Sequence, residues 1–117
     1  MNSIQASKTY DDALRRLNFI AEPLGISSNQ VRPPFSLDAV LDFAVTLASC
    51  QDDAAARSAI EHSNHAASIF LYLTASARDW LTSGCSNYEE PPQVGPFFYL
   101  ATFVSSYINK ELKKVSQ

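Results

Sequence analysis

The stretch DAAARSAIEHSNHAASIFLYLTASARDWLTS, residues 53–83, has the clearest helical periodicity in the chain and dominates its fold. Small or apolar residues recur in it at alternating spacings of three and four, as in a heptad seam: Ala56, Ala59, Ser63, Ala66, Phe70, Leu73, Ala77 and Trp80. Small residues in the first half let another helix approach closely, whereas the bulky second half must face a wider gap. The pattern predicts one long helix over residues 53–83.

Three further helices are predicted outside this stretch, over residues 9–22, 36–49 and 96–115. Thr9 is placed to cap the first of them, and Gly25 follows its end. Ser36 is placed to cap the second, and Pro96 is a favoured first residue for the third.

A break is predicted between Cys50 and Asp53, although no glycine or proline interrupts the sequence there. Asp52 and Asp53 suit the first turn of a new helix, because the positive end of the helix dipole favours acidic side chains. No strand-like alternation occurs anywhere in the chain. The predicted fold class is therefore all-α, a small four-helix bundle built as a single domain over residues 1–117.

The composition predicts a surface with few charged residues. Charged residues make up 18% of the 117 residues and apolar residues 46%, so we expect self-association as a homodimer, or a protein partner. The net charge of -3 argues against a direct nucleic-acid contact, which needs clustered lysine and arginine. Only Lys110, Lys113 and Lys114 cluster at all.

Neither a membrane nor an oxidising compartment is indicated. The longest apolar run, residues 66–77, has 12 residues and falls short of the about 20 that a bilayer span needs. The segment MNSIQASKTYDD resembles neither a secretion signal nor a transit peptide, so a cytoplasmic location is expected. Cys50 and Cys85 are expected to be free thiols, because the predicted long helix separates them.

No catalytic, cofactor or metal site is predicted. The two histidines, His62 and His65, are three residues apart, with only Glu61 as a nearby carboxylate, whereas structural zinc requires four ligands. The three glycines are isolated and form neither a phosphate-binding loop nor a nucleophile elbow. A solvated helix surface is the better interpretation of the histidine pair, and an enzyme of any class is not expected.

The last predicted helix contains the unusually aromatic segment FFYLATFVSSYI, residues 97–108. One apolar stripe is sufficient to dock this helix on the others: Phe97, Ala101, Val104, Ile108, Leu112 and Val115. A second stripe of Tyr99, Phe103 and Tyr107, joined to the first by Leu100, lies about 120° away. These four residues are the predicted partner-binding site, because aromatic side chains are enriched in interfaces. The alternative is that this helix is central and buried on two sides.

Two segments, RPPFSLDAVLDFAVTLASCQDDAAARSAI (residues 32–60) and YLTASARDWL (residues 72–81), resemble the small helical quorum-sensing anti-activators of pseudomonads. That resemblance implies an all-helical protein that pairs with itself and binds a LuxR-type transcription factor. By occupying the receptor's dimerisation surface, such a protein would keep the receptor off DNA.

Two other interpretations remain open. An acidic inhibitor or immunity protein could occlude a basic enzyme or toxin, in which case the important residues would be Asp52, Asp53, Glu61, Glu89 and Glu90. A small-ligand carrier could instead have a pocket between the third and fourth predicted helices.

Overall fold

A computed structural model describes residues 3–28, 31, 35–83 and 95–113 of the chain, with side chains described from residue 7 onward. In this part of the chain there are five α-helices and no strand, which confirms the all-α class. The helices are α1 (Ser3–Ala21), α2 (Leu37–Ala48), α3 (Asp53–His62), α4 (Asn64–Thr82) and α5 (Phe98–Tyr107). A 3-10 turn, Glu22–Leu24, follows α1, and one π-helical turn, Ile108–Leu112, extends α5. None of the described helices is long and apolar enough to cross a membrane.

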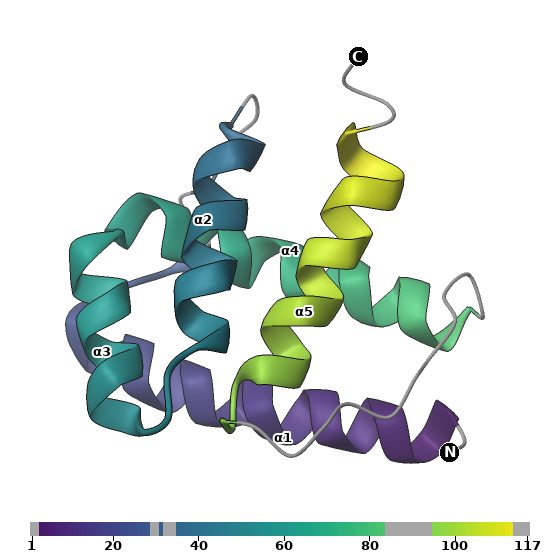
Figure 1. The fold of residues 1–117 in the computed structure, drawn as a ribbon, viewed down its shortest axis with the longest axis horizontal. Coiled ribbons are helices and arrows are strands. Elements are labelled where there is room, and N and C mark those ends of the chain that lie inside the picture. The colour runs from purple at the N-terminus through teal and green to yellow at the C-terminus, as the bar shows by residue number, and fades with distance from the viewer. Residues whose placement is uncertain (1–2, 29–30, 32–34, 84–94, 114–117) are drawn as a thin grey trace.

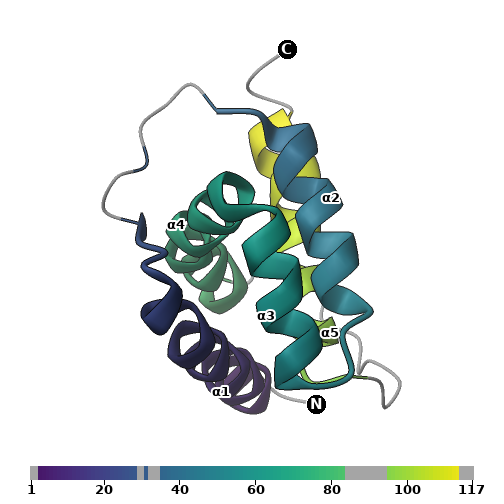
Figure 2. The same ribbon diagram turned by 90° about the vertical axis from the view of Figure 1, so that its left-hand side faces the viewer.

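The helices form two crossed layers. Antiparallel α1 and α4 make one layer, and α2, α3 and α5 make the other (Figures 1 and 2). In Figure 1, α2 and α5 run side by side in opposite directions and cross in front of α1 and α4. The molecule measures 34 × 34 × 21 Å. The predicted bundle of four helices is thus replaced by five helices whose layers cross.

Local signals at the ends of α1 and α2 have the expected effect at two of three positions. Gly25 takes a left-handed conformation (φ 72°) and its N–H donates to the carbonyl of Glu22, so the chain turns where predicted. The Ser36 hydroxyl accepts from the N–H of Ala39 at 3.4 Å and caps α2. Thr9, however, is not a cap, because α1 already begins at Ser3.

The predicted break between Cys50 and Asp53 is confirmed. Asp52 is extended (φ -148°, ψ 175°), and its carboxylate accepts from the N–H of Ala55 at 2.8 Å, which caps α3. This bond satisfies an N–H that has no partner inside the helix.

The single helix predicted over residues 53–83 is wrong, because the chain bends at Ser63 between α3 and α4. Ser63 has φ -141° and ψ 53°, outside the helical region. The bend falls in the polar run His62, Ser63, Asn64, whose residue types have weak helix propensity. It lets α3 pack beside α1 and α2 while α4 crosses the molecule to reach α5.

Polar contacts hold α1 against α4. The Tyr10 hydroxyl, fully buried, donates to the carbonyl of Thr74 at 2.7 Å, and burial raises the pKa of this phenol. Arg78 donates two hydrogen bonds to the carboxylate of Asp11, at 2.7 and 2.9 Å. Such forked pairs fix geometry as well as adding energy, so they set the register of the two helices.

Replacing Asp11 by asparagine should lower the free energy of unfolding by about 1 kcal/mol at neutral pH, because water screens this half-exposed pair. The hydrogen bonds from Arg78 hold the pKa of the Asp11 carboxyl below its ordinary value. Because the pKa of Asp11 is lower in the folded than in the unfolded protein, the ionised carboxylate stabilises the fold fully above the unfolded-state pKa of about 3.9. This stabilisation is lost as the pH falls through the folded-state pKa. Urea titrations of the wild type and Asp11→Asn should therefore differ at neutral pH and converge below about pH 4.

The matched control is Asp12→Asn, whose pair with Arg15 lies within α1 and is more exposed. It should change stability less at neutral pH. A difference for Asp11→Asn that persists unchanged in acid would contradict the assignment of its effect to the carboxylate.

Candidate functional site

The four residues predicted to bind a partner all lie on α5, and most of them are buried inside the molecule. Leu100 is fully buried, Phe103 and Tyr99 are 7% and 9% exposed, and Tyr107 is half-buried. The expected exposure of this stripe is therefore wrong. The alternative interpretation, a central helix buried on two sides, describes α5.

Both apolar stripes are buried because α5 has neighbours on two sides, α2 in its own layer and α1 and α4 in the other. The Phe103 ring centroid lies 5.3 Å from that of Trp80 on α4 and 5.9 Å from that of Tyr10 on α1. A partner could reach these rings only by displacing α1 or α4. The partner-binding role of Tyr99, Leu100, Phe103 and Tyr107 thus stays a prediction that no exposed surface supports.

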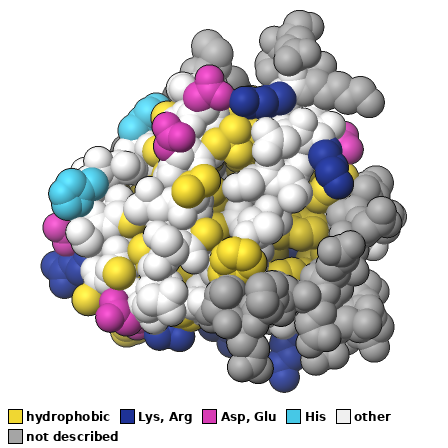
Figure 3. Space-filling view, in the orientation of Figure 1, with side chains coloured by type: hydrophobic (Ala, Val, Ile, Leu, Met, Phe, Trp, Pro, Cys, Tyr) yellow, Lys and Arg dark blue, Asp and Glu magenta, His cyan; other side chains and the backbone are white. Residues whose placement is uncertain are grey.

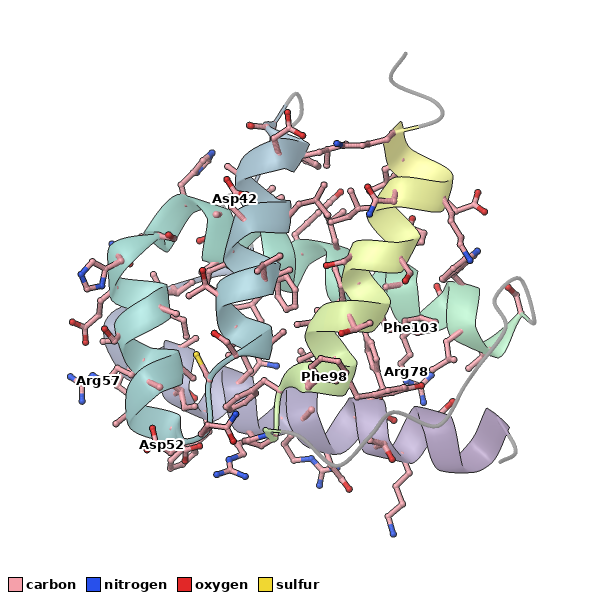
Figure 4. The ribbon with its side chains drawn as sticks, in the orientation of Figure 1. Asp42, Asp52, Arg57, Arg78, Phe98 and Phe103 are labelled. Atoms are coloured by element: carbon pink, nitrogen blue, oxygen red, sulfur yellow. The ribbon has the colours of Figure 1, made fainter. Side chains whose placement is uncertain are left out.

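A third side of α5 faces solvent. Phe98, Thr102, Ser105 and Asn109 recur at spacings of four, three and four, which places them along one side of the helix. Thr102 and Asn109 are exposed, and Phe98 and Ser105 are half-buried. Figure 4 labels Phe98 in the first turn of α5.

The neighbouring side of α2 is apolar and partly exposed: Val45 is exposed, whereas Leu41 and Ala48 are half-buried and pack against the core. Leu41, Val45 and Ala48 are spaced by four and three, and the Val45 side chain in their middle is 69% exposed. Asp38 lies two turns before Val45 on the same side of α2, and its carboxylate pairs with the Lys113 ammonium at 2.9 Å. This ion pair joins that side of α2 to the end of the π-helical turn that follows α5.

Together these residues form the candidate site, which we call the α2–α5 face. Its members are Leu41, Val45, Ala48, Phe98, Thr102 and Ser105. Figure 3 views this side of the molecule: apolar and uncharged side chains occupy its middle, and charged side chains lie around the edge. Depletion of charge at the centre with a polar rim is typical of the core of a protein interface.

No protein-family model, curated protein or solved structure matches the chain. The function must therefore be argued from the surface and its chemistry.

Among the described residues, two other large apolar side chains are exposed, Phe19 and Tyr72. Phe19 is 78% exposed on the outer side of α1, where Arg15 precedes it by four residues and Glu22 follows it by three. Tyr72 on α4 packs edge-on against the ring of Phe35, with centroids 6.1 Å apart. Single exposed apolar residues are common and need no partner.

The histidines do not form a metal site with other described residues. His62 and His65 are both exposed, and Nδ1 of His62 lies 2.7 Å from the carbonyl oxygen of Ser58. Over residues 3–28, 31, 35–83 and 95–113, no group of three or more histidine, cysteine or acidic residues is placed to hold an ion. The Glu61 carboxylate pairs with Arg57 at 2.9 Å instead.

Cys50 lies at the end of α2 and is a buried free thiol whose S–H donates to the carbonyl of Thr46 at 3.3 Å. Burial, and then the charge of Asp52, raise the pKa of this thiol. Since the thiolate is the reactive form, this setting is typical of a structural rather than a catalytic cysteine. Cys85 lies outside the described residues.

The acids of the inhibitor alternative are largely engaged within the molecule. Asp52 caps α3, Asp53 accepts a hydrogen bond from Arg16 at 2.6 Å, and Glu61 pairs with Arg57. Glu89 and Glu90 lie outside the described residues. An acidic surface presented to a basic target is therefore less well supported than the uncharged α2–α5 face.

The ligand-carrier interpretation predicts a pocket between the third and fourth predicted helices. In the structure, the corresponding helices that face each other are α4 and α5. Trp80, Phe103 and Tyr107 meet there, with the Trp80 and Tyr107 ring centroids 5.8 Å apart. A groove of about 540 Å³ lies elsewhere, between the end of α1 and α4, and is lined mainly by polar residues such as Asn18, Glu22 and Ser27. Most ligand pockets have a predominantly apolar lining, so this groove is a poor candidate.

Proposed function

We propose that this protein is a non-enzymatic regulator that acts by binding another protein through the α2–α5 face. One observation carries the proposal: Val45, on α2, is 69% exposed on a two-helix face whose middle, in Figure 3, carries apolar and uncharged side chains. Covering an exposed apolar side chain removes it from water, which stabilises the complex with a partner.

For the partner we propose a LuxR-type transcription factor, which would make the protein a cytoplasmic quorum-sensing anti-activator. Support comes from the resemblance of residues 32–60 and 72–81 to such proteins. The first segment includes the whole of α2, and hence the residues Leu41, Val45 and Ala48 of the face. The segment that carries the resemblance thus supplies half of the candidate site.

The proposed mechanism is competition between helical interfaces. A transcription factor that reads two half-sites must present two DNA-binding modules at a fixed spacing, and it loses specific affinity as a monomer. Two adjacent helices with an uncharged centre are suitable to cover the helices of a receptor dimer face. No cofactor, metal ion or contact with DNA is required.

The direct test is to mix the protein with the ligand-binding domain of a LuxR-type receptor and measure molar mass by light scattering. We expect the receptor dimer to be replaced by a complex with one receptor domain. A receptor dimer that persists at saturating protein would overturn the displacement mechanism.

Ionic strength distinguishes this proposal from an acid-led inhibitor. A complex through the α2–α5 face should keep its affinity when salt is raised from low to physiological concentration, because its centre is uncharged. A complex that weakens steeply over this range would favour the acidic surface instead.

A further inference from the structure

Little apolar packing holds α3 in the fold. It has 10 residues, and its buried side chains are Ala56, Ala59 and Ile60. The equally long α5 buries much larger side chains, among them Leu100 and Phe103. Because the free energy of burial follows the apolar area removed from water, two alanines contribute little. A helix shorter than about 12 residues is only marginally stable by itself in water, so α3 depends on this small contact.

Both ends of α3 are separated from the neighbouring helices by residues outside the helical region. Asp52 is extended (φ -148°, ψ 175°), and Ser63 has φ -141° and ψ 53°. The Ser63 side chain makes no hydrogen bond that caps α4. The segment between these two residues can therefore unwind without unwinding α2 or α4, as in a local unfolding unit.

In the part of the chain that the structure describes, one ion pair joins α3 to another helix. Arg16 on α1 donates from Nε to the Asp53 carboxylate at 2.6 Å, and both side chains are about half exposed. The other ion pair of α3, between Arg57 and Glu61, lies within the helix, and Figure 4 labels Arg57 on its outer side. The Arg16 guanidinium also lies over the ring of Phe97, 5.6 Å from its centroid. Arg16 thus connects α1 with α3 and with the residue before α5.

The α3 helix covers a thiol. A groove of about 380 Å³ between α2 and α3 is lined by Thr46 and Cys50 from α2 and the residues after it, and by Ala55 and Ala59 from α3. Cys50 is 5% exposed, and its S–H donates to the carbonyl of Thr46. Departure of α3 removes one wall of this groove, so the thiol becomes accessible to solvent.

We propose that α3 is a flap: residues 53–62 unwind and leave α1 and α2 while the other four described helices stay folded, and the Arg16–Asp53 ion pair is the latch. The open form exposes Cys50 and the sides of α1 and α2 that α3 covers in the closed form. Val45 stays exposed in both forms, because α2 remains folded. Opening therefore presents a second apolar surface without removing the α2–α5 face, and the inference does not depend on a receptor.

The reactivity of Cys50 measures the opening. Cys85→Ser leaves Cys50 as the one thiol of the chain, and the rate of its reaction with excess aromatic disulfide reagent is followed at increasing urea concentration. Below about 1 M urea, the rate should depend on urea far more weakly than global unfolding measured by circular dichroism. The physical reason is that opening of α3 exposes much less surface than global unfolding does.

Two matched substitutions separate local opening from global unfolding. Asp53→Asn and Asp11→Asn each remove the acid of an ion pair that involves α1, the first with α3 and the second with α4. Asp53→Asn should speed the reaction of Cys50 about fivefold in the absence of urea, because it weakens the latch and removes an acid from the first turn of α3. Asp11→Asn should leave this rate unchanged, because α1 and α4 stay packed together in both forms.

A second pair of variants tests whether α3 unwinds as it leaves. Ala55 on α3 and Ala75 on α4 are both exposed. Ala55→Gly should speed the reaction about threefold, because glycine disfavours the helix that is lost on opening. Ala75→Gly should not change the rate, because α4 remains helical.

The inference would be overturned by a reaction with the full urea dependence of global unfolding. Equal acceleration by Asp53→Asn and Asp11→Asn would also overturn it, as would a rate that Asp53→Asn leaves unchanged. Equal rates for Ala55→Gly and Ala75→Gly would exclude unwinding of α3. Circular dichroism melts check that each variant is folded, and no receptor is present, so the result is independent of the proposed function.

Discussion

Replacing Phe103 by alanine should lower the free energy of unfolding by about 3–5 kcal/mol, the range for large aromatic residues in well-packed cores. Its ring is 7% exposed and contacts the rings of Trp80, Tyr10 and Tyr99 at centroid distances of 5.3, 5.9 and 6.1 Å. The substitution removes the side chain that joins α5 to both helices of the other layer. Urea denaturation followed by circular dichroism measures the change.

The matched control is Thr102→Ala, one residue earlier on the exposed side of α5. It should change the free energy of unfolding by less than about 0.5 kcal/mol. If Phe103→Ala instead kept the stability of the wild type and lost a protein partner, the buried position of this ring would be contradicted. The partner-binding site first predicted from the sequence would then be restored.

Helix ends could be predicted from the sequence where the signal is local. Ser36 caps α2 and Asp52 caps α3 through bonds to N–H groups three residues away, so neighbouring residues suffice to identify them. Gly25 likewise ends its helical turn because the left-handed conformation is available to it without steric cost. Such signals do not depend on what the helix packs against.

Breaks and contacts decided by the tertiary arrangement could not be predicted. The heptad seam of residues 53–83 continues through Ser63, yet the chain bends there because α3 and α4 pack on different neighbours. The same holds for Arg16, which pairs with Asp53 at 2.6 Å and lies over the ring of Phe97, 5.6 Å from its centroid. Sequence spacing gives no indication of partners that are 37 residues or more away.

The burial of the predicted partner-binding stripe on α5 has a related cause. Helical angles correctly divide the side chains of α5 into stripes, but they do not say how many neighbours the helix has. With α2 on one side and α1 and α4 on the other, both aromatic stripes are buried. Val45 belongs to an apolar run, LDFAVTLA, in which spacing alone does not show that an exposed valine lies on a binding surface. Its neighbours Ala44 and Leu47 are indeed buried.

Replacing Val45 by aspartate should abolish receptor binding while the fold remains intact. A charge at the centre of an interface loses its hydration when a partner covers it. We expect a loss of at least about 2 kcal/mol of binding free energy, or about thirtyfold in affinity. Stability should change by less than about 0.5 kcal/mol, because the side chain is exposed in the monomer.

Phe19→Asp is the matched control, because it adds the same charge in place of an apolar side chain that is even more exposed and lies outside the α2–α5 face. Its affinity for the receptor domain should equal that of the wild type, as measured by titration calorimetry. Binding lost in Phe19→Asp and kept in Val45→Asp would move the interface to α1. Binding lost equally in both would trace the effect to net charge, which falls by one in each variant. Only loss confined to Val45→Asp assigns the binding to the α2–α5 face, because the two variants differ in the position of the new charge and not in its sign.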